Sequence, residues 1–344
     1  MRRTTLGRPS AVLAAAAATL LGIARPLAGQ GDPGLARLER EIGRLAELAG
    51  GPMGVGARHL ETGREVYLNA DDPFPMASTF KVPVAVQLFT RVQRGEVSLD
   101  SMIALRPQDL HPGSGTLTEL FDDPGVILSL RNLVELMLLI SDNSATDIVL
   151  RTAGGPAAVT ARMQSLGLRG IRVDRPTLGL IADWIGVSGI PADRDFTPAV
   201  FDTLARAVTD STRAGAARAF DQDPRDTATP RDMTTLLTRL WRGELLDSTR
   251  TALMLDIMRR STTGAGRIRG MLAPDVVVSH KTGTIGGTTN DVGIITLPDG
   301  AGHVAVSLFV KQSARDVEQR ERAIAHVARA IYDYFTFNPR GSLP

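Results

Sequence analysis

Three short motifs place a nucleophile, a base and anion-binding groups at separate points of the chain. Ser78 stands three residues before Lys81, and two residues at this spacing share one face of a helix. A serine hydroxyl beside a lysine amine is a nucleophile with its activator. The positive potential at the start of such a helix would also stabilise a developing oxyanion. Taken alone, the spacing fits a helix-capping serine near a solvated lysine equally well.

The other two motifs supply a hydroxyl, an amide and a cation. Residues 141–143, Ser-Asp-Asn, directly follow a mostly apolar segment, which places them well for pointing into a cleft. Residues 281–283, Lys-Thr-Gly, follow a strand pattern and combine a charge, a hydroxyl and a glycine that permits close approach of a ligand. Each of these motifs alone is compatible with an ordinary turn.

Lysine is rare in this chain, and its positions are informative. Only three of the 39 lysines and arginines are lysine, namely Lys81, Lys281 and Lys311. Arginine serves wherever a fixed charge is enough, whereas a buried lysine can lose its proton and act as a base. Two of the three lysines lie in the motifs, which favours a chemical role for them.

The hydrophobic pattern predicts the elements that must hold these motifs. A helix is expected over 35–45, strands over 55–59 and 65–68, a buried helix over 78–92, and only helices over 91–244. Strand patterns return at 276–279, 291–296 and 304–310, and a helix closes the chain at 323–334. This order predicts an α+β fold: an antiparallel sheet of about five strands, flanked by N- and C-terminal helices, with an inserted all-helical lobe. The α/β part would comprise 30–90 and 245–344, and the lobe 91–244.

The first 29 residues are typical of an export signal. Arg2, Arg3 and Arg8 form a basic start, an apolar run covers 11–23, and Ala28 or Gly29 offers a small-residue cleavage site. We therefore expect a periplasmic or secreted protein, by the general or the twin-arginine route; a membrane anchor is the alternative, although the apolar run is short. Removal of this segment lowers the formal charge from +2 to −2, and no basic stripe indicates nucleic acid.

Composition excludes several kinds of chemistry. The chain has no cysteine, which rules out disulfides, thiol catalysis and cysteine zinc sites. Its five histidines show no metal-ligand spacing, so we expect neither a metal nor another cofactor. Nothing in the pattern demands more than a monomer.

Together and in this order, the motifs match the set S-x-x-K, S-D-N and K-T-G. From about residue 33 to the C-terminus the chain resembles the class A serine β-lactamases and, more distantly, the penicillin-binding proteins. Residues 290–295 and the turn 298–300 are similar to the strand and turn that follow K-T-G in that family. The resemblance implies a β-lactamase or transpeptidase fold, and a β-lactam as the small-molecule substrate.

The resemblance also implies a role for each motif residue. Ser78 would form the acyl-enzyme after activation by Lys81, and Ser141 would protonate the leaving lactam nitrogen. The oxyanion would sit between the backbone N–H groups of Ser78 and Thr284. Arg267 falls where some members place a carboxylate-binding arginine, although a solvated surface charge is an equal alternative. The implied substrate-binding residues are Asn143, Lys281, Thr282, Gly283, Thr284 and Arg267.

The chain departs from the family where deacylation is concerned. Family members use a glutamate on an Ω-loop, which here spans 175–226 and is expected to be closed by an Arg175–Asp226 ion pair. Thr177 stands at the glutamate position, and the chain has no glutamate between Glu135 and Glu244. Asp183 is a possible replacement base, although a solvated loop residue is the simpler interpretation. The other options are Lys81 as the base for both steps, or slow deacylation.

The long Ω-loop is expected to contain helices, since about fifty structureless residues are improbable. Thr197-Pro198 is typical of a helix start, and 211–220 predicts a second helix. The leading hypothesis is a periplasmic or secreted β-lactamase that hydrolyses the amide of the four-membered lactam ring, for which antibiotic resistance is one biological role. The alternatives are a DD-peptidase or esterase with the same Ser–Lys chemistry, and a penicillin-binding sensor that deacylates slowly.

Overall fold

A computed structural model describes Met1, residues 32–192 and residues 195–338. Apart from its first residue, the predicted export signal lies outside the described residues. In the part of the chain that is described, no helix is long and apolar enough to cross a membrane.

A five-stranded antiparallel sheet is assembled from both ends of the chain, in the order β2-β1-β9-β8-β7. The predicted α+β fold with about five strands is therefore confirmed. One boundary differs, because the third motif lies inside β7 and does not follow it. The strands are β1 (Met53–His59), β2 (Glu65–Leu68), β7 (Val278–Ile285), β8 (Thr288–Thr296) and β9 (His303–Val310).

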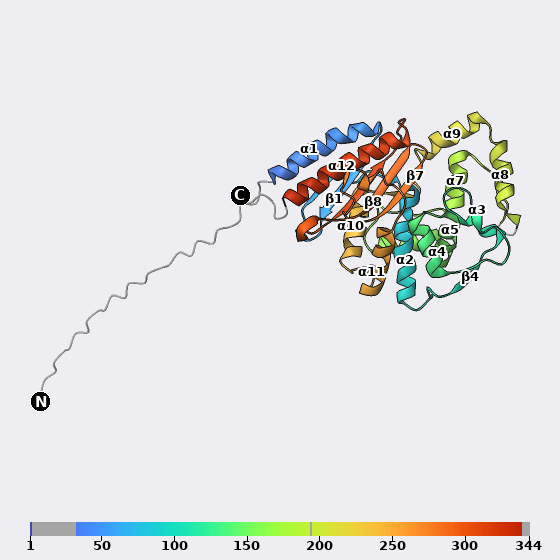
Figure 1. Cartoon of the computed structure of the whole chain (residues 1–344), viewed down its shortest axis with the longest axis horizontal. Helices are drawn as coiled ribbons and strands as arrows, with labels where there is room; N and C mark the ends of the chain where they lie inside the picture. Colours follow the sequence, from blue (N-terminus) through green and yellow to red (C-terminus); the bar gives the residue numbers. More distant parts are fainter. Residues whose placement is uncertain (2–31, 193–194, 339–344) are drawn as a thin grey trace. The chain divides into compact units, whose positions relative to one another are not determined.

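Helices from the two chain ends pack on the sheet. The terminal helices α1 (Pro33–Ala46) and α12 (Val317–Phe337) lie side by side across it, as Figure 1 shows. Their apolar faces share a core with the inward side chains of β1 and β9. The helix α10 (Pro230–Trp241) packs on β1 and β9, and α11 (Ser248–Arg259) packs on β7. Residues of the predicted lobe, 91–244, thus include one helix that covers the sheet.

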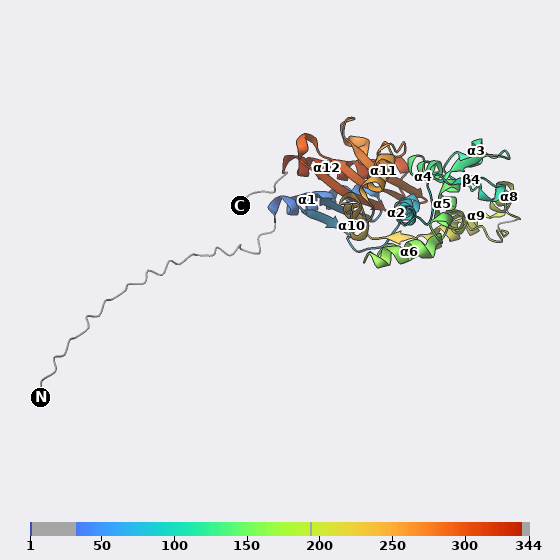
Figure 2. The same ribbon diagram turned by 90° about the horizontal axis from the view of Figure 1, so that it is seen from below.

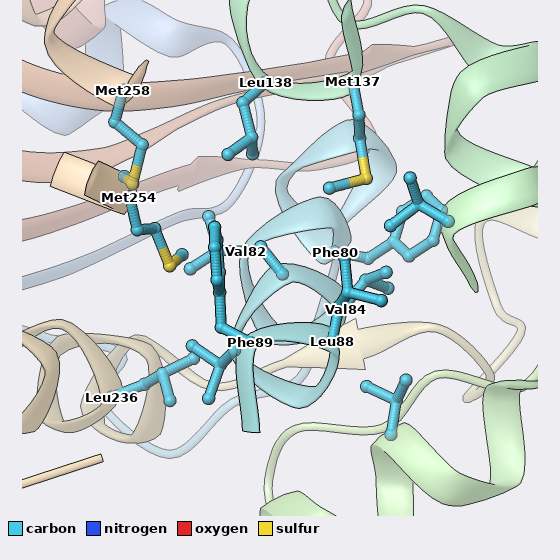
Figure 3. Close-up of a cluster of buried hydrophobic side chains, with 14 of the residues drawn as sticks. Phe80, Val82, Val84, Leu88, Phe89, Met137, Leu138, Leu236, Met254 and Met258 are labelled. Carbon is cyan, nitrogen blue, oxygen red and sulfur yellow. The ribbon is translucent and has the colours of Figure 1, made fainter. Parts of the chain in front are cut away.

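The helix α2 (Lys81–Gln93) is the centre of the second core, and the short 3-10 helix η2 (Ala77–Phe80) leads into it. Apart from Lys81 and Arg91 its residues are uncharged, and all but three of them are buried. Figure 3 draws Val82, Leu88 and Phe89 packed among side chains of neighbouring helices. Complete burial of each such side chain contributes about 1.5–3 kcal/mol, which fixes the first turn of α2 in place. The neighbours on this side are α4 (Leu130–Leu139), α5 (Asn143–Thr152) and α6 (Gly155–Ser165).

The described residues of the Ω-loop include three α-helices, two of which, α8 (Pro198–Ala207) and α9 (Asp210–Phe220), are labelled in Figure 2. Two follow the predicted starts, with Thr197 capping the first through its side chain. The third, α7 (Thr177–Ile185), was not predicted, and its apolar side chains share a small cluster with Phe196 and Phe201. It also packs against α9.

Four short strands and one short helix complete the described strands and α-helices. Three of these strands lie in the region where only helices were expected, because runs of two or three residues are too brief to show a period of two. The four short strands form two pairs, β3 (Phe74–Pro75) with β6 (Thr227–Ala228) and β4 (Met102–Ala104) with β5 (Ile127–Ser129). The short helix is α3 (Leu117–Leu120).

Candidate active site

Ser78 lies in the first turn of η2, where the chain arrives from β3 in a constrained conformation. Ala77, directly before it, has a φ of 44°, which is unfavourable for a residue with a side chain. The Asn290 amide on β8 donates to the carbonyls of Pro75 and Met76, at 2.8 and 2.9 Å, and fixes this turn from the sheet side. Ser78 itself is partly exposed.

Gly283 allows strand β7 to approach the backbone of this turn. A Cβ at position 283 would come within 2.6 Å of the Met76 carbonyl oxygen and 2.9 Å of the Ser78 nitrogen. Only glycine permits that distance without displacement of the backbone. Thr284 is the next residue of β7 and lines the same cavity as Ser78; these are the two residues whose backbone N–H groups were predicted to bind the oxyanion.

Lys81 is completely buried, and its ammonium group faces the second motif. Its Nζ donates to the Ser141 carbonyl oxygen at 2.7 Å, to Ser141 Oγ at 3.0 Å and to Asn143 Oδ1 at 3.0 Å. Burial lowers the pKa of Lys81 to about 7, although the charges of Asp142 and Asp147 act in the opposite direction. Lys81 therefore loses its proton far more readily than an exposed lysine, while the three donated hydrogen bonds describe its ammonium form.

Ser141 connects the first and third motifs. Its Oγ also receives a hydrogen bond from Lys281 Nζ at 3.0 Å, so a single hydroxyl lies between two amines. Ser141 has a φ of 63°, and Ser114 Oγ donates to its carbonyl oxygen at 2.7 Å. Burial lowers the pKa of Lys281 well below its ordinary value, and the charges of Lys81 and Arg267 lower it further. The arrangement provides a short proton path between the two lysines.

A cavity of about 420 Å³ opens beside Ser78. Its polar lining includes Ser78, Asn143 and Thr284, while helix α7 contributes the apolar side chains of Leu180 and Trp184. The predicted nucleophile and two of the predicted substrate-binding residues thus line one cavity.

The remaining predicted substrate-binding residues lie next to this cavity but are engaged with other groups. Thr282 is buried, and its hydroxyl is 2.7 Å from that of Thr263. Arg267 is buried as well, and it donates to Thr284 Oγ1 at 2.6 Å, to the carbonyls of Gly283 and Asn290, and to Glu321. Its guanidinium therefore supports the strand that carries Thr284. This finding contradicts the alternative of a solvated surface charge.

Asn143 is held tightly within the second motif. Its Oδ1 accepts from Lys81, and its Nδ2 donates to the Pro112 carbonyl at 2.9 Å. Asp142, between Ser141 and Asn143, accepts from the backbone N–H groups of Thr116, Leu117 and Ala145 and caps helix α5. The triplet is rigid because each of its side chains has a partner.

The predicted ion pair at the two ends of the Ω-loop is confirmed. Arg175 Nε donates to Asp226 Oδ2 at 2.6 Å, and both side chains are buried. Asp183 belongs to the same cluster, because its carboxylate pairs with Arg175 at 2.5 Å and with Arg225 at 3.0 Å. It is exposed and is not among the residues that line the cavity beside Ser78. The structure therefore gives Asp183 a role in closing the loop and does not bring it to the nucleophile.

Thr177 does line the cavity, at the first residue of α7. Its backbone N–H donates to Asp147 Oδ1 at 2.7 Å, and its buried hydroxyl has no hydrogen-bond partner among the described residues. The residue at the expected glutamate position is thus correctly placed but carries no base.

Three contributors were not identified as site residues from the sequence. Asn290 belongs to the predicted strand and turn segment 290–295 and stands in none of the three motifs, and Ser114 lies in a loop without a recognisable motif. His111 was set aside for lack of metal-ligand spacing, yet its Nδ1 lies 2.7 Å from Asp147 Oδ2. Pairing of a histidine with a carboxylate 36 residues away leaves no signal in a single sequence.

Residues 37–335 match the family model described as the beta-lactamase enzyme family. The carbapenem-hydrolyzing beta-lactamase KPC of Klebsiella oxytoca is 30% identical over 307 residues, which cover 88% of this chain and 91% of the relative. A beta-lactamase structure from Chitinophaga pinensis is 30% identical with a TM-score of 0.71, covering 86% of this chain and 98% of that one.

A penicillin-binding relative is also among the similar structures. It is a point mutant of PBP-A, solved as an acyl-enzyme complex with penicillin G. It is 26% identical with a TM-score of 0.69, and the alignment covers 88% of this chain and 97% of that one.

Proposed function

The chain belongs to the beta-lactamase enzyme family, as a hydrolase of the class A serine type, and we propose that it opens β-lactams through an acyl-enzyme on Ser78. One observation carries the proposal. Lys81, three residues after Ser78 and completely buried, has a pKa of about 7 and donates to the Ser141 hydroxyl. An amine with that pKa can accept a proton at neutral pH, which an arginine at the same position could not do.

In the acylation step, neutral Lys81 removes the hydroxyl proton of Ser78 while the oxygen attacks the lactam carbonyl carbon. The carbonyl oxygen becomes an oxyanion, which accepts hydrogen bonds from the backbone N–H groups of Ser78 and Thr284. The C–N bond then breaks. The nitrogen takes a proton from Ser141 Oγ, and Ser141 is reprotonated by Lys81 across 3.0 Å.

Substrate binding uses the side chains around this proton path. Lys281 and Thr282 attract the carboxylate of the substrate, and Asn143 is close enough to the cavity to hold the side-chain amide. The arriving carboxylate raises the pKa of the buried Lys281 and so favours its cationic form. Arg267 acts through Thr284 as a positioning residue, since its donors are already bound to the protein.

The deacylation step needs a base for the attacking water. Thr177 supplies none, and Asp183 is bound to two arginines. Lys81 therefore acts in both half-reactions: it takes a proton from water as the water oxygen attacks the ester carbon. The same proton is returned to Ser78 Oγ as the acyl C–O bond breaks, which restores the free enzyme.

The test is the lifetime of the acyl-enzyme. A chromogenic cephalosporin should be turned over many times per enzyme molecule, and Ser78→Ala should abolish both turnover and the acyl mass adduct. A single stoichiometric burst followed by a stable adduct would overturn the lactamase reaction. It would favour the alternative of a penicillin-binding protein that deacylates slowly, and the PBP-A relative was itself solved as an acyl-enzyme complex with penicillin G.

We further propose that the protein acts outside the cytoplasm as a monomer and protects its host against β-lactams. The support for export is the basic start and apolar run of the first 29 residues. Mass measurement of the secreted or periplasmic form, and the inhibitory β-lactam concentration of cells that express it, test these points.

A further inference from the structure

The carboxylate of Asp147 links two parts of the site that the reaction depends on. It lies on α5 and accepts from two backbone N–H groups at the start of α7, those of Thr177 at 2.7 Å and Leu178 at 3.1 Å. These are orphan donors of a helix N-terminus, and a carboxylate is their natural partner. Asp147 thus fixes the first residues of the helix that forms one wall of the cavity.

The same carboxylate acts on the base. The negative charges of Asp142 and Asp147 both raise the pKa of Lys81 and so favour its protonated form. Asp142 is already surrounded by three backbone donors within its own loop. Any change in the charge around Asp147 therefore changes how readily Lys81 gives up its proton.

His111 supplies a matching charge to Asp147. Its Nδ1 lies 2.7 Å from Asp147 Oδ2, and its Nε2 lies 3.1 Å from the carbonyl oxygen of Gln108. Both partners are acceptors, so both ring nitrogens are satisfied only when both carry a proton. This geometry favours the imidazolium form of His111.

The surroundings of His111 support the same conclusion. Burial alone would lower the pKa of His111, but the hydrogen bond and the charge of Asp147 outweigh it and raise the pKa above its ordinary value. The other nearby carboxylate, Asp109, is neutralised by Arg106 at 2.8 Å and Arg151 at 2.9 Å. Asp147 is therefore left as the partner of His111.

We propose that His111 is a positioning residue of the hydrolysis, acting through Asp147. It holds the carboxylate at the start of α7, and it offsets the negative charge that would otherwise keep Lys81 protonated. The inference rests on the proposed role of Lys81 as the base. It adds a residue from the loop before α3 to a mechanism that the three motifs alone do not complete.

The decisive measurement is the pH profile of kcat/KM with a chromogenic cephalosporin. His111→Gln keeps a side chain that can donate to Asp147 but removes the positive charge, so the pKa of Lys81 should rise. The acid limb of the profile should then move up by about 1 pH unit, so that activity is first lost near pH 7–8. Asp147→Asn removes the negative charge, and its acid limb should move down.

Opposite shifts from the two variants cannot come from a general loss of order. A matched control is His303→Gln, because His303 also pairs with a carboxylate, Glu61 at 2.7 Å, at the opposite end of β9 from the site. Its profile should be unchanged. If His111→Gln lowers kcat/KM by the same factor at every pH and leaves the limb in place, the role is structural only and the proposal is overturned.

A second measurement does not depend on turnover or on the folding of any variant. Nitrogen NMR of the imidazole in the wild-type protein should find both nitrogens of His111 protonated at pH 7. A neutral ring at pH 7 would overturn the proposal even if the enzyme hydrolyses β-lactams as expected. If the ring is charged while Lys81→Arg retains full activity, the proposed base has failed, and His111 then has no role in catalysis through Lys81.

Discussion

Lys81 Nζ lies 3.0 Å from Ser141 Oγ, a contact between two motifs that are 60 residues apart in the chain. Because Lys281 reaches the same oxygen, the two cations of the site share one hydroxyl. Two ammonium groups so close in a buried site repel each other. The site is therefore most stable with at least one neutral amine, which is the form that a general base requires.

The pH dependence of acylation follows from this relationship. Lys81 must be neutral to remove the Ser78 proton, and its pKa is lowered to about 7. Acylation should therefore be full above pH 8 and should decline as the pH falls through about 7, tenfold per unit below that. Stopped-flow acylation at single turnover measures this limb directly. A limb at the ordinary pKa of lysine, or no limb above pH 5, would contradict the assignment of Lys81.

The scarcity of lysine gives a matched pair of substitutions. Lys81→Arg keeps the charge but removes the base, and it should reduce kcat/KM by about 10²- to 10⁴-fold. Lys311→Arg is the control, because Lys311 donates to the Pro73 carbonyl and stacks on Phe74, for which a fixed cation is enough. Its activity should equal that of the wild type. Equal losses in both variants would mean that the argument from lysine scarcity is wrong.

The sequence predicted most of this site because its chemistry is concentrated in short motifs. The residues of each motif are separated by three positions or fewer, so each motif can be recognised in the amino-acid sequence without knowledge of the fold. The five main strands were visible for a similar reason, since each of the longer ones buries most of its residues in a continuous run.

What the sequence could not provide are partners that only the fold brings together. Asp183 was a plausible base while its surroundings were unknown, and the ion pairs with Arg175 and Arg225 assign it elsewhere. His111 was passed over because a single histidine shows no spacing, and helix α7 was missed because it is only nine residues long. Its length is set by Pro176 at one end and Gly186, with a φ of 80°, at the other.

The ion-pair cluster of the Ω-loop predicts that substitutions of Asp183 and Asp226 differ in their effect on stability, and that substitution of Asp183 leaves turnover unchanged. Asp183→Asn should leave turnover unchanged and lower the free energy of unfolding by no more than about 1 kcal/mol, since its carboxylate is exposed. Asp226→Ala should lower it by about 3–5 kcal/mol, because Arg175 then loses its buried partner. Urea denaturation and steady-state kinetics on both variants test this contrast. Loss of turnover in Asp183→Asn at unchanged stability would return it to the catalytic residues.

The lining of the cavity predicts a preference for uncharged substrate side chains. Among the described residues that line it none is charged, and Leu180, Ile181 and Trp184 of α7 form an apolar wall. Benzylpenicillin should therefore have a kcat/KM about tenfold or more above that of its α-carboxy derivative, whose extra carboxylate would be desolvated without a partner.

Trp184→Ala should reduce this preference by lowering the value for benzylpenicillin. The other tryptophan of the chain provides the control, because Trp241 packs on His303 and does not line the cavity. Trp241→Ala should leave the ratio of the two substrates unchanged. An equal or higher kcat/KM for the carboxylated penicillin in the wild type would show that the wall does not contact the substrate side chain.

The position of Thr177 predicts that a single substitution there can speed up deacylation. Its backbone is fixed by Asp147 and its side chain lines the cavity beside Ser78. Its hydroxyl has no partner among the described residues, so replacing it breaks no hydrogen bond there. Thr177→Glu should place a carboxylate where a water can be activated, and should shorten the lifetime of the acyl-enzyme by about 10²-fold.

Thr177→Gln is the matched control, with the same size and no base, and its acyl-enzyme should last at least as long as that of the wild type. Mass spectrometry of the quenched enzyme after a penicillin pulse measures the lifetimes of all three proteins. Since the carboxylate introduced by Thr177→Glu would lie near Asp147, repulsion between the two should raise the pKa of the new group and limit the gain at low pH. Equal lifetimes for the Glu and Gln variants would mean that position 177 does not face the acyl carbonyl.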